Sequence, residues 1–261
     1  MTEWTIDAAV GELLRRERGR EDGGRITEGW PELDLGTAYR IQDALLDRKV
    51  RDGQSVVGVK LGLTSRAKQR RMGVDDPLTG WLTDAMTLRP GEPVSVGGLI
   101  HPRVEPEIVF VMGARLSGPG VTAERAMSAV GSVHAGFEVI DSRYRDFDFT
   151  LPDVVADNAS SSRFVVSGQA VPPGGLDLAA EPCRLDVDGN TVDKATGAAV
   201  LGHPANALAF AANVLAGRGM AIEPGWVVLT GGLTDAVPLR PGGTVSVDFA
   251  SLGVLSLTGT H

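Results

Sequence analysis

The sequence predicts a fold of the mixed α/β (α+β) class, in which a mixed or antiparallel sheet is flanked by helices. Short apolar runs between glycine and proline residues, typical of strands, recur from residue 54 onward, for example at 56–59 and 109–111. Helical patterns are fewer and do not alternate strictly with these runs, as a doubly wound sheet would require. Apolar residues make up 43% of the chain but aromatic residues only 5%, so the core must consist mainly of Val, Leu, Ile and Ala.

Residues 1–53 are expected to form an N-terminal helical region packed on the rest of the chain. Leu13 and Leu14 belong to a charged first helix, and a polar stretch that contains glycine follows it. Thr37 is the expected cap of a second helix, because a threonine hydroxyl can accept a hydrogen bond from the first turn. The apolar stripe of this second helix consists of Ala38, Ile41 and Leu45.

Residues 54–261 are expected to form the second unit, which is richer in strands. A helical pattern covers residues 122–133, and another helix is expected to begin after His203. The tail at residues 244–257 alternates between apolar and polar side chains well enough to form two strands. No internal repeat and no low-complexity segment is evident in the sequence.

Charge and cysteine content exclude several classes of protein. The formal net charge of −8 argues against general nucleic-acid binding, because proteins that follow phosphate backbones are usually basic. A single cysteine, Cys183, excludes an internal disulfide framework and a cysteine-rich zinc site. The N-terminus carries acidic residues and no apolar run of 18 residues is evident, so neither a signal peptide nor a membrane-spanning helix is expected. We therefore expect a cytoplasmic protein.

Three glutamates stand where the surrounding sequence predicts buried strands. Glu105 and Glu107 precede an apolar run, and residues two apart in a strand point to the same face. Glu138 lies between apolar neighbours in a second expected strand. Buried carboxylates are costly unless a partner compensates their charge, and a hard divalent cation does so well. These glutamates are therefore candidate ligands of Mg²⁺ or Mn²⁺ in an enzyme that acts on a small oxo-acid.

Three further segments carry groups that could meet a substrate. Lys60 lies in a glycine-flanked apolar run, where its partner would be an anionic substrate group or one of the three glutamates; a lysine that snorkels from a strand edge is the alternative. Residues 151–163 include many small hydrogen-bonding side chains, which could bind a carboxylate or form an ordinary loop. Residues 229–234 predict a strand that ends in a glycine turn, a weak signal of a site.

Together these segments resemble the 2-hydroxypentadienoate hydratases and 4-oxalocrotonate decarboxylases of aromatic meta-cleavage pathways, which belong to the fumarylacetoacetate hydrolase superfamily. The resemblance begins near Pro31 and covers most of the chain. Its motifs are residues 57–65, Met72-Gly73-Val74, His101-Pro102 with Glu105-Pro106-Glu107, residues 138–143 and 156–161, Gly202-His203-Pro204-Ala205, and Thr230-Gly231-Gly232.

This resemblance implies a fold like the C-terminal domain of fumarylacetoacetate hydrolase, a rolled mixed β-sheet with flanking helices, here with an N-terminal helical region. It also implies that residues 54–261 form a metal-dependent catalytic domain. The Mg²⁺ or Mn²⁺ ion would be held by Glu105, Glu107 and Glu138, the same glutamates that the strand pattern selects.

Within this family the motifs favour the decarboxylases. Residues 141–149, 201–204 and 230–234 resemble the decarboxylase version of each motif. Hydratases also tend to carry an acidic residue at the position of Leu78. A hydratase needs an acid or base to add water across a double bond, so an apolar residue there weakens the hydratase interpretation.

The expected reaction is the metal-dependent decarboxylation of 4-oxalocrotonate (2-oxohex-3-enedioate) to 2-hydroxypenta-2,4-dienoate and CO₂. The substrate is a vinylogous β-keto acid, and a divalent ion bound to its 1-carboxylate and 2-oxo group would stabilise the dienolate that CO₂ loss leaves behind. We expect Lys60 to add a second positive charge and Ser160 to hydrogen-bond the substrate. The other expected substrate-binding residues are Leu61, Leu78, Asn158, Thr230 and Gly231.

Other functions stay open on the sequence. They are a 2-hydroxypentadienoate hydratase, an acylpyruvate-type carbon–carbon hydrolase that would pair His101 with a carboxylate, and a non-catalytic scaffold subunit that would bind metal weakly or not at all. His101 is also a candidate neighbour of a metal ligand, whereas His134 and His203 are expected to cap or pack. We expect an oligomer with a hydratase of the same family as a candidate partner, and no nucleic-acid or membrane partner.

Overall fold

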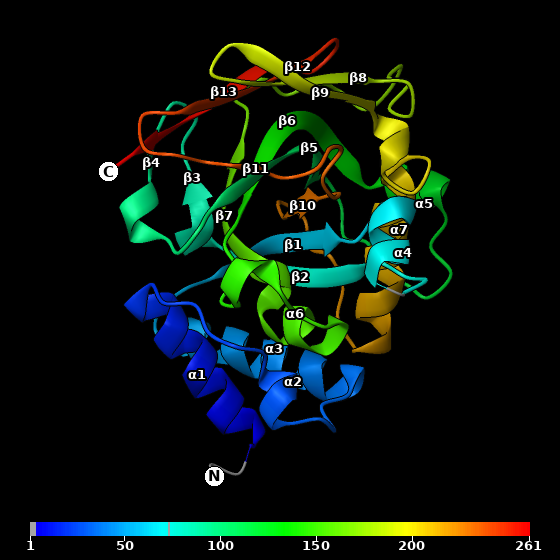
Figure 1. The fold of residues 1–261 in the computed structure, drawn as a ribbon. Coiled ribbons are helices and arrows are strands. Elements are labelled where there is room, and N and C mark those ends of the chain that lie inside the picture. Colours follow the sequence, from blue (N-terminus) through cyan, green and yellow to red (C-terminus); the bar gives the residue numbers. More distant parts are fainter. Residues whose placement is uncertain (1–3, 73) are drawn as a thin grey trace.

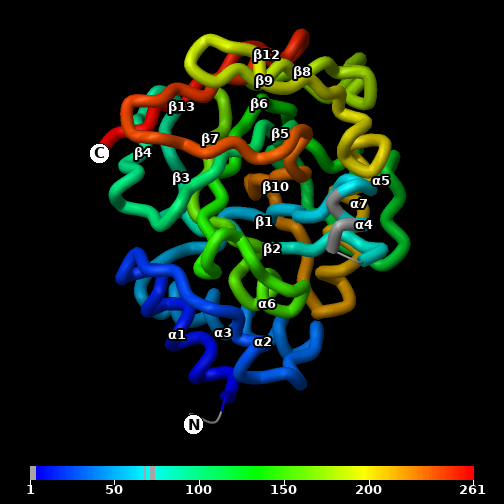
Figure 2. Tube along the Cα trace, in the orientation of Figure 1, coloured from blue at the N-terminus to red at the C-terminus, as the bar shows by residue number. Residues whose placement is uncertain are grey.

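The computed structural model describes residues 4–72 and 74–261, except for the side chains of Lys68, Arg71 and Met72. Gly73, the centre of the Met72-Gly73-Val74 motif, lies outside the described residues. The N-terminal helices occupy one end of the molecule, a large curled sheet its middle, and a smaller sheet the opposite end (Figures 1 and 2).

Three helices form the N-terminal region: α1 (Ile6–Gly19), α2 (Ile26–Gly29) and α3 (Leu35–Arg51). Thr5 caps α1 by accepting a hydrogen bond from the Ala8 amide. The cap of α3 is Asp34, whose carboxylate accepts a hydrogen bond from the Thr37 amide, so the expected cap at Thr37 was wrong. An ionised carboxylate also interacts favourably with the positive end of the helix dipole, which explains why the helix begins after Asp34.

The main sheet has eight strands and is mixed, which confirms the predicted fold class. The pairs β1–β10 and β3–β7 are parallel, and the central pair β5–β6 is antiparallel. In spatial order the strands are β2 (Leu78–Thr83), β1 (Val56–Gly62), β10 (Val227–Leu229), β5 (Arg103–Met112), β6 (Val130–Ile140), β7 (Ser161–Val166) and β3 (Thr87–Leu88), with β11 (Val237–Pro238) paired to the start of β5.

The smaller sheet has five strands and contains the C-terminal tail. The expected pair of tail strands is present as an antiparallel hairpin of β12 and β13. In spatial order the strands are β4 (Val94–Ser95), β13 (Gly253–Thr260), β12 (Thr244–Phe249), β8 (Pro182–Val187) and β9 (Asn190–Thr196).

Four further helices surround the sheets: α4 (Arg66–Met72), α5 (Ala123–Ser128), α6 (Leu151–Ala156) and α7 (Pro204–Gly217). The helical pattern expected at residues 122–133 was too long, because α5 ends at Ser128 and β6 begins at Val130. The β-branched Val130 and Val133 pair with β5 instead, as their strand propensity favours. His203 caps α7 by accepting a hydrogen bond from the Ala205 amide, in agreement with the capping role expected for it.

By length and composition alone, the segment Gly197–Gly217 is long and apolar enough to cross a membrane, although His203, Asn206 and Asn213 interrupt its apolar residues. Most of it is α7, which packs into the main hydrophobic core through Leu208, Ala211 and Leu215. Its apolar character on most sides is that of a core helix.

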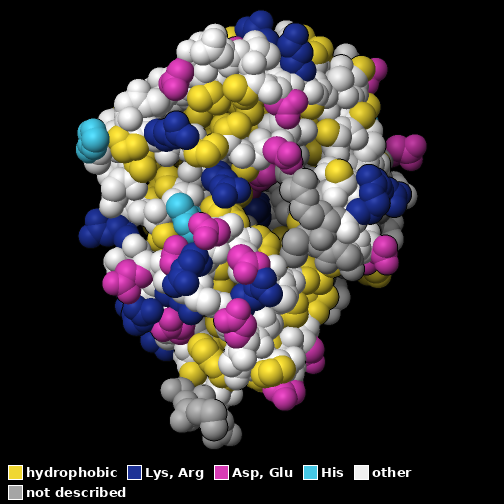
Figure 3. All heavy atoms as spheres, in the orientation of Figure 1, with side chains coloured by type: hydrophobic (Ala, Val, Ile, Leu, Met, Phe, Trp, Pro, Cys, Tyr) yellow, Lys and Arg dark blue, Asp and Glu magenta, His cyan; other side chains and the backbone are white. Residues whose placement is uncertain are grey.

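A second hydrophobic cluster joins the N-terminal helices to the elements that border the site described below. It contains Leu13 of α1 and Ile41 of α3. The other side of the cluster includes Leu78 of β2, Val155 of α6, and Ala159, which follows α6. The N-terminal region therefore supports one wall of the site from behind. On the face drawn in Figure 3, Lys and Arg side chains are interspersed with Asp and Glu.

Candidate metal-dependent active site

Glu105, Glu107 and Glu138 meet on one face of the β5–β6 pair. In the antiparallel register Glu105 lies directly opposite Glu138, and Glu107 lies opposite Gly136. Because opposite residues share a face and side chains alternate along each strand, all three carboxylates point to the same side. One carboxylate oxygen from each residue lies within 4.8 Å of the others. The structure thus brings together the three glutamates that the sequence selected.

This arrangement is electrostatically unfavourable without a cation. Glu107 and Glu138 are both 0% exposed. Glu105 lies directly opposite Glu138, and like charges in that position destabilise a sheet. Burial, and then repulsion from Glu138, raises the pKa of Glu107 well above its ordinary value. Burial also raises the pKa of Glu138, although the nearby Lys60 opposes this shift.

The donor set fits Mg²⁺ or Mn²⁺. The Oε1 atoms of Glu107 and Glu138 are buried and have no hydrogen-bond partner among the residues that the structure describes. Three clustered carboxylates, two of which have an unsatisfied oxygen, match the oxygen-only ligands that a hard divalent cation prefers. A bound cation would also compensate the buried negative charge.

Lys60 of β1 lies beside the carboxylate cluster. Its ammonium nitrogen is 2.9 Å from Glu138 Oε2 and donates a hydrogen bond of 3.1 Å to the backbone oxygen of Ala159. The side chain is only 3% exposed, so it does not snorkel from a strand edge. The structure therefore places a buried positive charge at one side of the three glutamates, paired with one of them.

The glycine turn after β10 binds Glu107 and lies close to Glu105. The Gly231 amide donates a hydrogen bond of 2.6 Å to Glu107 Oε2. Gly231 has φ +112°, and a Cβ there would collide with the Thr64 side chain. A Cβ at Gly232 would lie 2.7 Å from the carboxylate carbon of Glu105. Only glycine fits at these close approaches.

Two expected substrate-binding residues have hydrogen-bond partners within the protein. The Thr230 hydroxyl donates to the Ile108 backbone oxygen at 2.7 Å. The Asn158 side chain accepts from the Trp81 amide at 2.7 Å and donates to the Trp81 carbonyl at 2.9 Å. The Gly231 amide donates to Glu107, and Gly231 is absent from the lining of the cavity described below. These contacts hold the three residues in place, and their expected contacts with a substrate stay predictions.

Ser160 lies on a left-handed turn at the edge of the site. Asn158, Ala159 and Ser160 have φ values of 48°, 55° and 56°, although none is glycine. This conformation costs about 1–2 kcal/mol per residue, so the surrounding contacts must maintain it. The turn presents the Ala159 carbonyl to Lys60 and places Ser160 in the cavity wall.

A cavity of about 110 Å³ opens beside Glu105 and Lys60. Among the described residues that line it, these two carry the charged side chains, and most of the remaining wall is apolar. The expected Leu61, Leu78 and Ser160 are part of this wall. The other lining side chains are Leu63, Thr64, Ile140, Phe147, Phe149, Val154 and Ala159, completed by Gly62 and Gly232.

Sequence reasoning missed the aromatic part of this wall. Phe147 has φ +59°. The centroid of its ring lies 4.8 Å from that of the His101 ring, which is tilted by 33°, and 4.2 Å from the guanidinium carbon of Arg103. His101 also bonds through Nε2 to the Ser142 carbonyl oxygen at 2.8 Å. His101 therefore packs against Phe147, and its expected place beside Glu105 stays a prediction. Two phenylalanines within three residues, in a chain with only seven, were the available signal.

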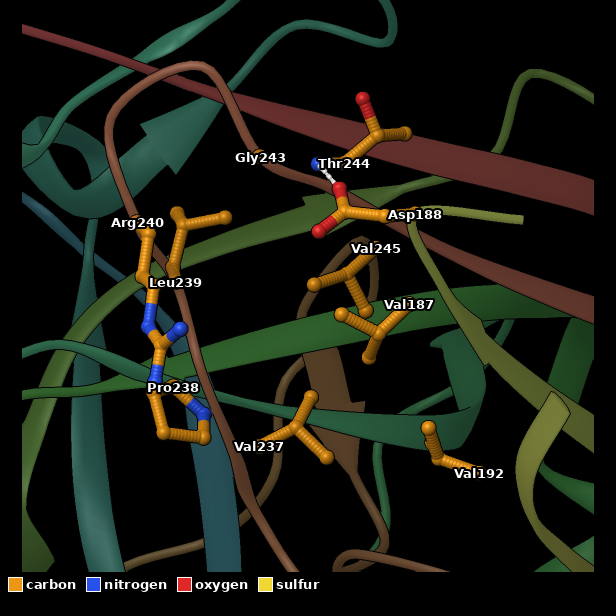
Figure 4. Close-up of a pocket in the computed structure, with 10 residues that line it drawn as sticks. All are labelled: Val187, Asp188, Val192, Val237, Pro238, Leu239, Arg240, Gly243, Thr244 and Val245. Atoms are coloured by element: carbon orange, nitrogen blue, oxygen red, sulfur yellow. Dashed lines mark hydrogen bonds between the residues drawn. The ribbon is translucent and has the colours of Figure 1, made fainter. Parts of the chain in front are cut away.

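A second cavity, of about 240 Å³, lies between the smaller sheet and β11. Figure 4 shows its mainly apolar lining, with Val187, Val192 and Val245 on one side and residues of the 237–240 segment on the other. Its carboxylate, Asp188, accepts a hydrogen bond from the Thr244 amide at 2.8 Å (Figure 4). Asp188 is the single carboxylate among the described residues that line it, whereas the glutamate cluster borders the first cavity through Glu105.

Comparisons with known proteins agree with this geometry. The chain is 43% identical over 252 residues to a 4-oxalocrotonate decarboxylase of Pseudomonas sp. (strain CF600), covering 97% of this chain and 96% of the relative. It is 38% identical over 238 residues to a 2-hydroxyhexa-2,4-dienoate hydratase of Comamonas testosteroni, covering 90% of each.

The structure is also similar to that of 4-oxalocrotonate decarboxylase from Pseudomonas putida G7 complexed with magnesium and adipate. The TM-score is 0.95 at 38% identity, over 99% of this chain and 100% of the other. The family described as fumarylacetoacetate (FAA) hydrolase C-terminal matches residues 55–258. The chain therefore belongs to the fumarylacetoacetate hydrolase family.

Proposed function

We propose that this protein is a Mg²⁺- or Mn²⁺-dependent decarboxylase that converts 4-oxalocrotonate to 2-hydroxypenta-2,4-dienoate and CO₂. The observation that carries the proposal is the buried glutamate cluster with Lys60 beside it, at the end of a mainly apolar cavity. Identities of 42–45% to three 4-oxalocrotonate decarboxylases support the choice of substrate.

The three glutamates would hold the metal, which supplies Lewis-acid stabilisation of negative charge on the 2-oxo oxygen of the substrate. Lys60 provides a fixed positive charge on the same side of the cavity, where it stabilises the charge that develops as the carbon–carbon bond to CO₂ breaks. Ser160 offers a hydroxyl in the cavity wall, from the same turn whose Ala159 carbonyl binds Lys60. These groups are held before the substrate arrives, so little reorganisation is needed during the reaction.

The apolar wall has a separate role at the carboxylate that leaves. Leu61, Leu78 and Phe147 give that end of the cavity few hydrogen-bond donors and little room for water. A poorly solvated carboxylate is less stable than its neutral product CO₂, so such surroundings favour its loss. The same wall keeps water from the reactive product, which disfavours hydration in the same cavity.

The test is to incubate the purified protein with Mg²⁺ and 2-oxohex-3-enedioate, and to follow CO₂ release and the appearance of 2-hydroxypentadienoate. We expect release that depends on Mg²⁺ or Mn²⁺ and stops when EDTA removes the metal. Absence of CO₂ release with either metal would refute the proposal.

Hydration of 2-hydroxypentadienoate is the second candidate, because several hydratases are 34–38% identical to this chain. Leu78 stands against it, since the cavity wall then lacks an acid or base at this position. Water addition to 2-hydroxypentadienoate, without CO₂ release from the dicarboxylate, would favour the hydratase.

Hydratase-type relatives exist in the same family, and we propose association with such a hydratase, which would consume the decarboxylase product. Oligomer formation is proposed on the same basis. Light scattering of the protein alone tests oligomer formation, and a monomeric mass would contradict it. Light scattering of a mixture with a hydratase of this family tests the association, and the absence of a mixed complex would contradict that proposal.

A further inference from the structure

A buried ion pair lies directly behind the left-handed turn that carries Ser160. Arg143, which follows β6, is 4% exposed, and Asp157, at the end of α6, is 0% exposed. The Arg143 Nε atom donates to Asp157 Oδ1, and the Arg143 amide donates to Asp157 Oδ2 at 3.1 Å. The cavity-lining residues do not include either member of this pair.

The Arg143 guanidinium also bonds to the backbone on both sides of the turn. Nη2 donates to the Asp157 carbonyl oxygen at 2.6 Å, before the turn, and Nη1 donates to the Ser161 carbonyl oxygen at 3.3 Å, after it. Nη1 also donates to the Asp141 carbonyl oxygen at 2.6 Å. A planar guanidinium has donors in a rigid fork, so it can span these acceptors where the single nitrogen of a lysine could not.

Asp157 reaches the turn from within. Its Oδ2 atom accepts a hydrogen bond of 3.4 Å from the Ser160 hydroxyl, and its backbone oxygen accepts one of 2.9 Å from the Ser160 amide. The three residues between these anchors are those with left-handed backbone, and Ala159 among them accepts the Lys60 hydrogen bond. A relaxation of the turn would move the Ala159 carbonyl and release one of the two partners of Lys60.

We propose that Arg143 and Asp157 are positioning residues, which maintain the left-handed turn and thereby fix Lys60 and Ser160 relative to the three glutamates. This inference rests on the proposed function, because it concerns the groups assigned there to charge stabilisation and substrate binding. The glutamates themselves lie on β5 and β6, so the pair should affect turnover more than metal binding. A displacement of about 1 Å in a reacting group can lower a rate by roughly 100-fold.

The chain offers a matched control on the same helix. Asp153 is also a fully buried carboxylate of α6, but it bonds to Thr27 and Thr150 and not to the turn. Asp157→Asn and Asp153→Asn should be compared in the full-length protein saturated with Mg²⁺ at pH 8. Burial raises the pKa of Asp157 to about 6, so the wild-type carboxyl is ionised at this pH.

We expect Asp157→Asn to lower kcat by roughly 10- to 100-fold and to leave KM and Mg²⁺ affinity within about twofold of wild type. Asp153→Asn should lower the melting temperature but keep kcat. Unchanged kcat in Asp157→Asn, or an equal loss in Asp153→Asn, would overturn the proposal. If Asp157→Asn does not fold, Arg143→Lys, which keeps the charge but not the fork, is judged by the same criteria.

A measurement without turnover separates this inference from the proposed function. The ¹⁵N chemical shift of Lys60 Nζ reports its hydrogen bond to Ala159. It should move in Asp157→Asn and remain in place in Asp153→Asn; an unchanged shift in Asp157→Asn would overturn the positioning role. A wild-type protein that releases no CO₂ would refute the decarboxylase assignment, while the chemical shifts would still decide on the ion pair.

Discussion

Replacing Glu107 with Gln should stabilise the metal-free protein and abolish its stabilisation by Mg²⁺. Glu107 is fully buried, and its carboxylate has those of Glu105 and Glu138 within 4.8 Å. At an effective dielectric constant near 20, two unit charges 4.8 Å apart repel each other by roughly 3.5 kcal/mol. A neutral amide removes this repulsion, can still accept the hydrogen bond from Gly231, and can donate to a neighbouring carboxylate.

Because proton uptake already relieves part of the repulsion, we expect Glu107→Gln to stabilise the metal-free protein by about 1–3 kcal/mol. Each kcal/mol corresponds to a rise in melting temperature of roughly 2–4 °C for a chain of this size. Mg²⁺ at about 100 times its dissociation constant should stabilise the wild type by about 2.7 kcal/mol. The variant lacks one anionic ligand, so Mg²⁺ at the same concentration should leave its melting temperature unchanged.

The assay is thermal unfolding followed by circular dichroism, with and without Mg²⁺, after treatment with EDTA. Glu32→Gln is the control, because Glu32 is exposed and lies in a turn; it should behave like the wild type in both conditions. A lower melting temperature for metal-free Glu107→Gln, or an equal Mg²⁺-dependent rise in both proteins, would refute the assignment of Glu107 as a ligand.

Three further outcomes are expected. Burial raises the folded-state pKa values of Glu107 and Glu138, so their contribution to the stability of the metal-free protein should be greatest below pH 4.5 and should be lost as pH rises. Mg²⁺ needs the ionised carboxylates, so Mg²⁺ titrations should show tighter binding at pH 8 than at pH 6. Gly231→Ala should weaken Mg²⁺ binding by roughly 10- to 100-fold in calorimetry, whereas Gly175→Ala, also at positive φ but in open space, should not. Lys60→Met should lower kcat by about 10²- to 10³-fold in the CO₂ assay while Mg²⁺ binding persists; an unchanged kcat would exclude its electrostatic role.

The glutamate cluster could be predicted because its geometry is local. A spacing of two residues places Glu105 and Glu107 on one face of any strand, and the apolar neighbours of Glu138 mark a buried strand. The register that sets Glu105 opposite Glu138 is a tertiary feature, yet burial of all three leaves few other ways to compensate their charge. The mixed sheet was predictable for a similar reason, since strand patterns without regular intervening helices exclude a fully parallel order.

The roles of Asn158, Thr230 and His101 could not be predicted, because each depends on partners far away in the sequence. The Asn158 amide is committed to Trp81, 77 residues earlier, and the Thr230 hydroxyl to Ile108, 122 residues earlier. The left-handed turn was hidden for another reason: glycine is the usual sign of such backbone, and Asn158, Ala159 and Ser160 contain none. Only the surrounding hydrogen bonds make that conformation stable.

The costs within this site are linked to one another. The buried negative charge of Glu138 is partly compensated by Lys60, and the buried charge of Lys60 is solvated by the Ala159 carbonyl. That carbonyl can bind Lys60 only while the left-handed turn persists. The hydrogen bonds of the buried Arg143 to the backbone on both sides of the turn maintain it. Each of these buried groups depends on the next one for a compensating partner. A substitution that removes a buried charge should therefore stabilise the fold but also remove a group that turnover requires. Stabilising changes at Glu107 and loss of activity should therefore occur together, which distinguishes a functional carboxylate cluster from a merely structural one.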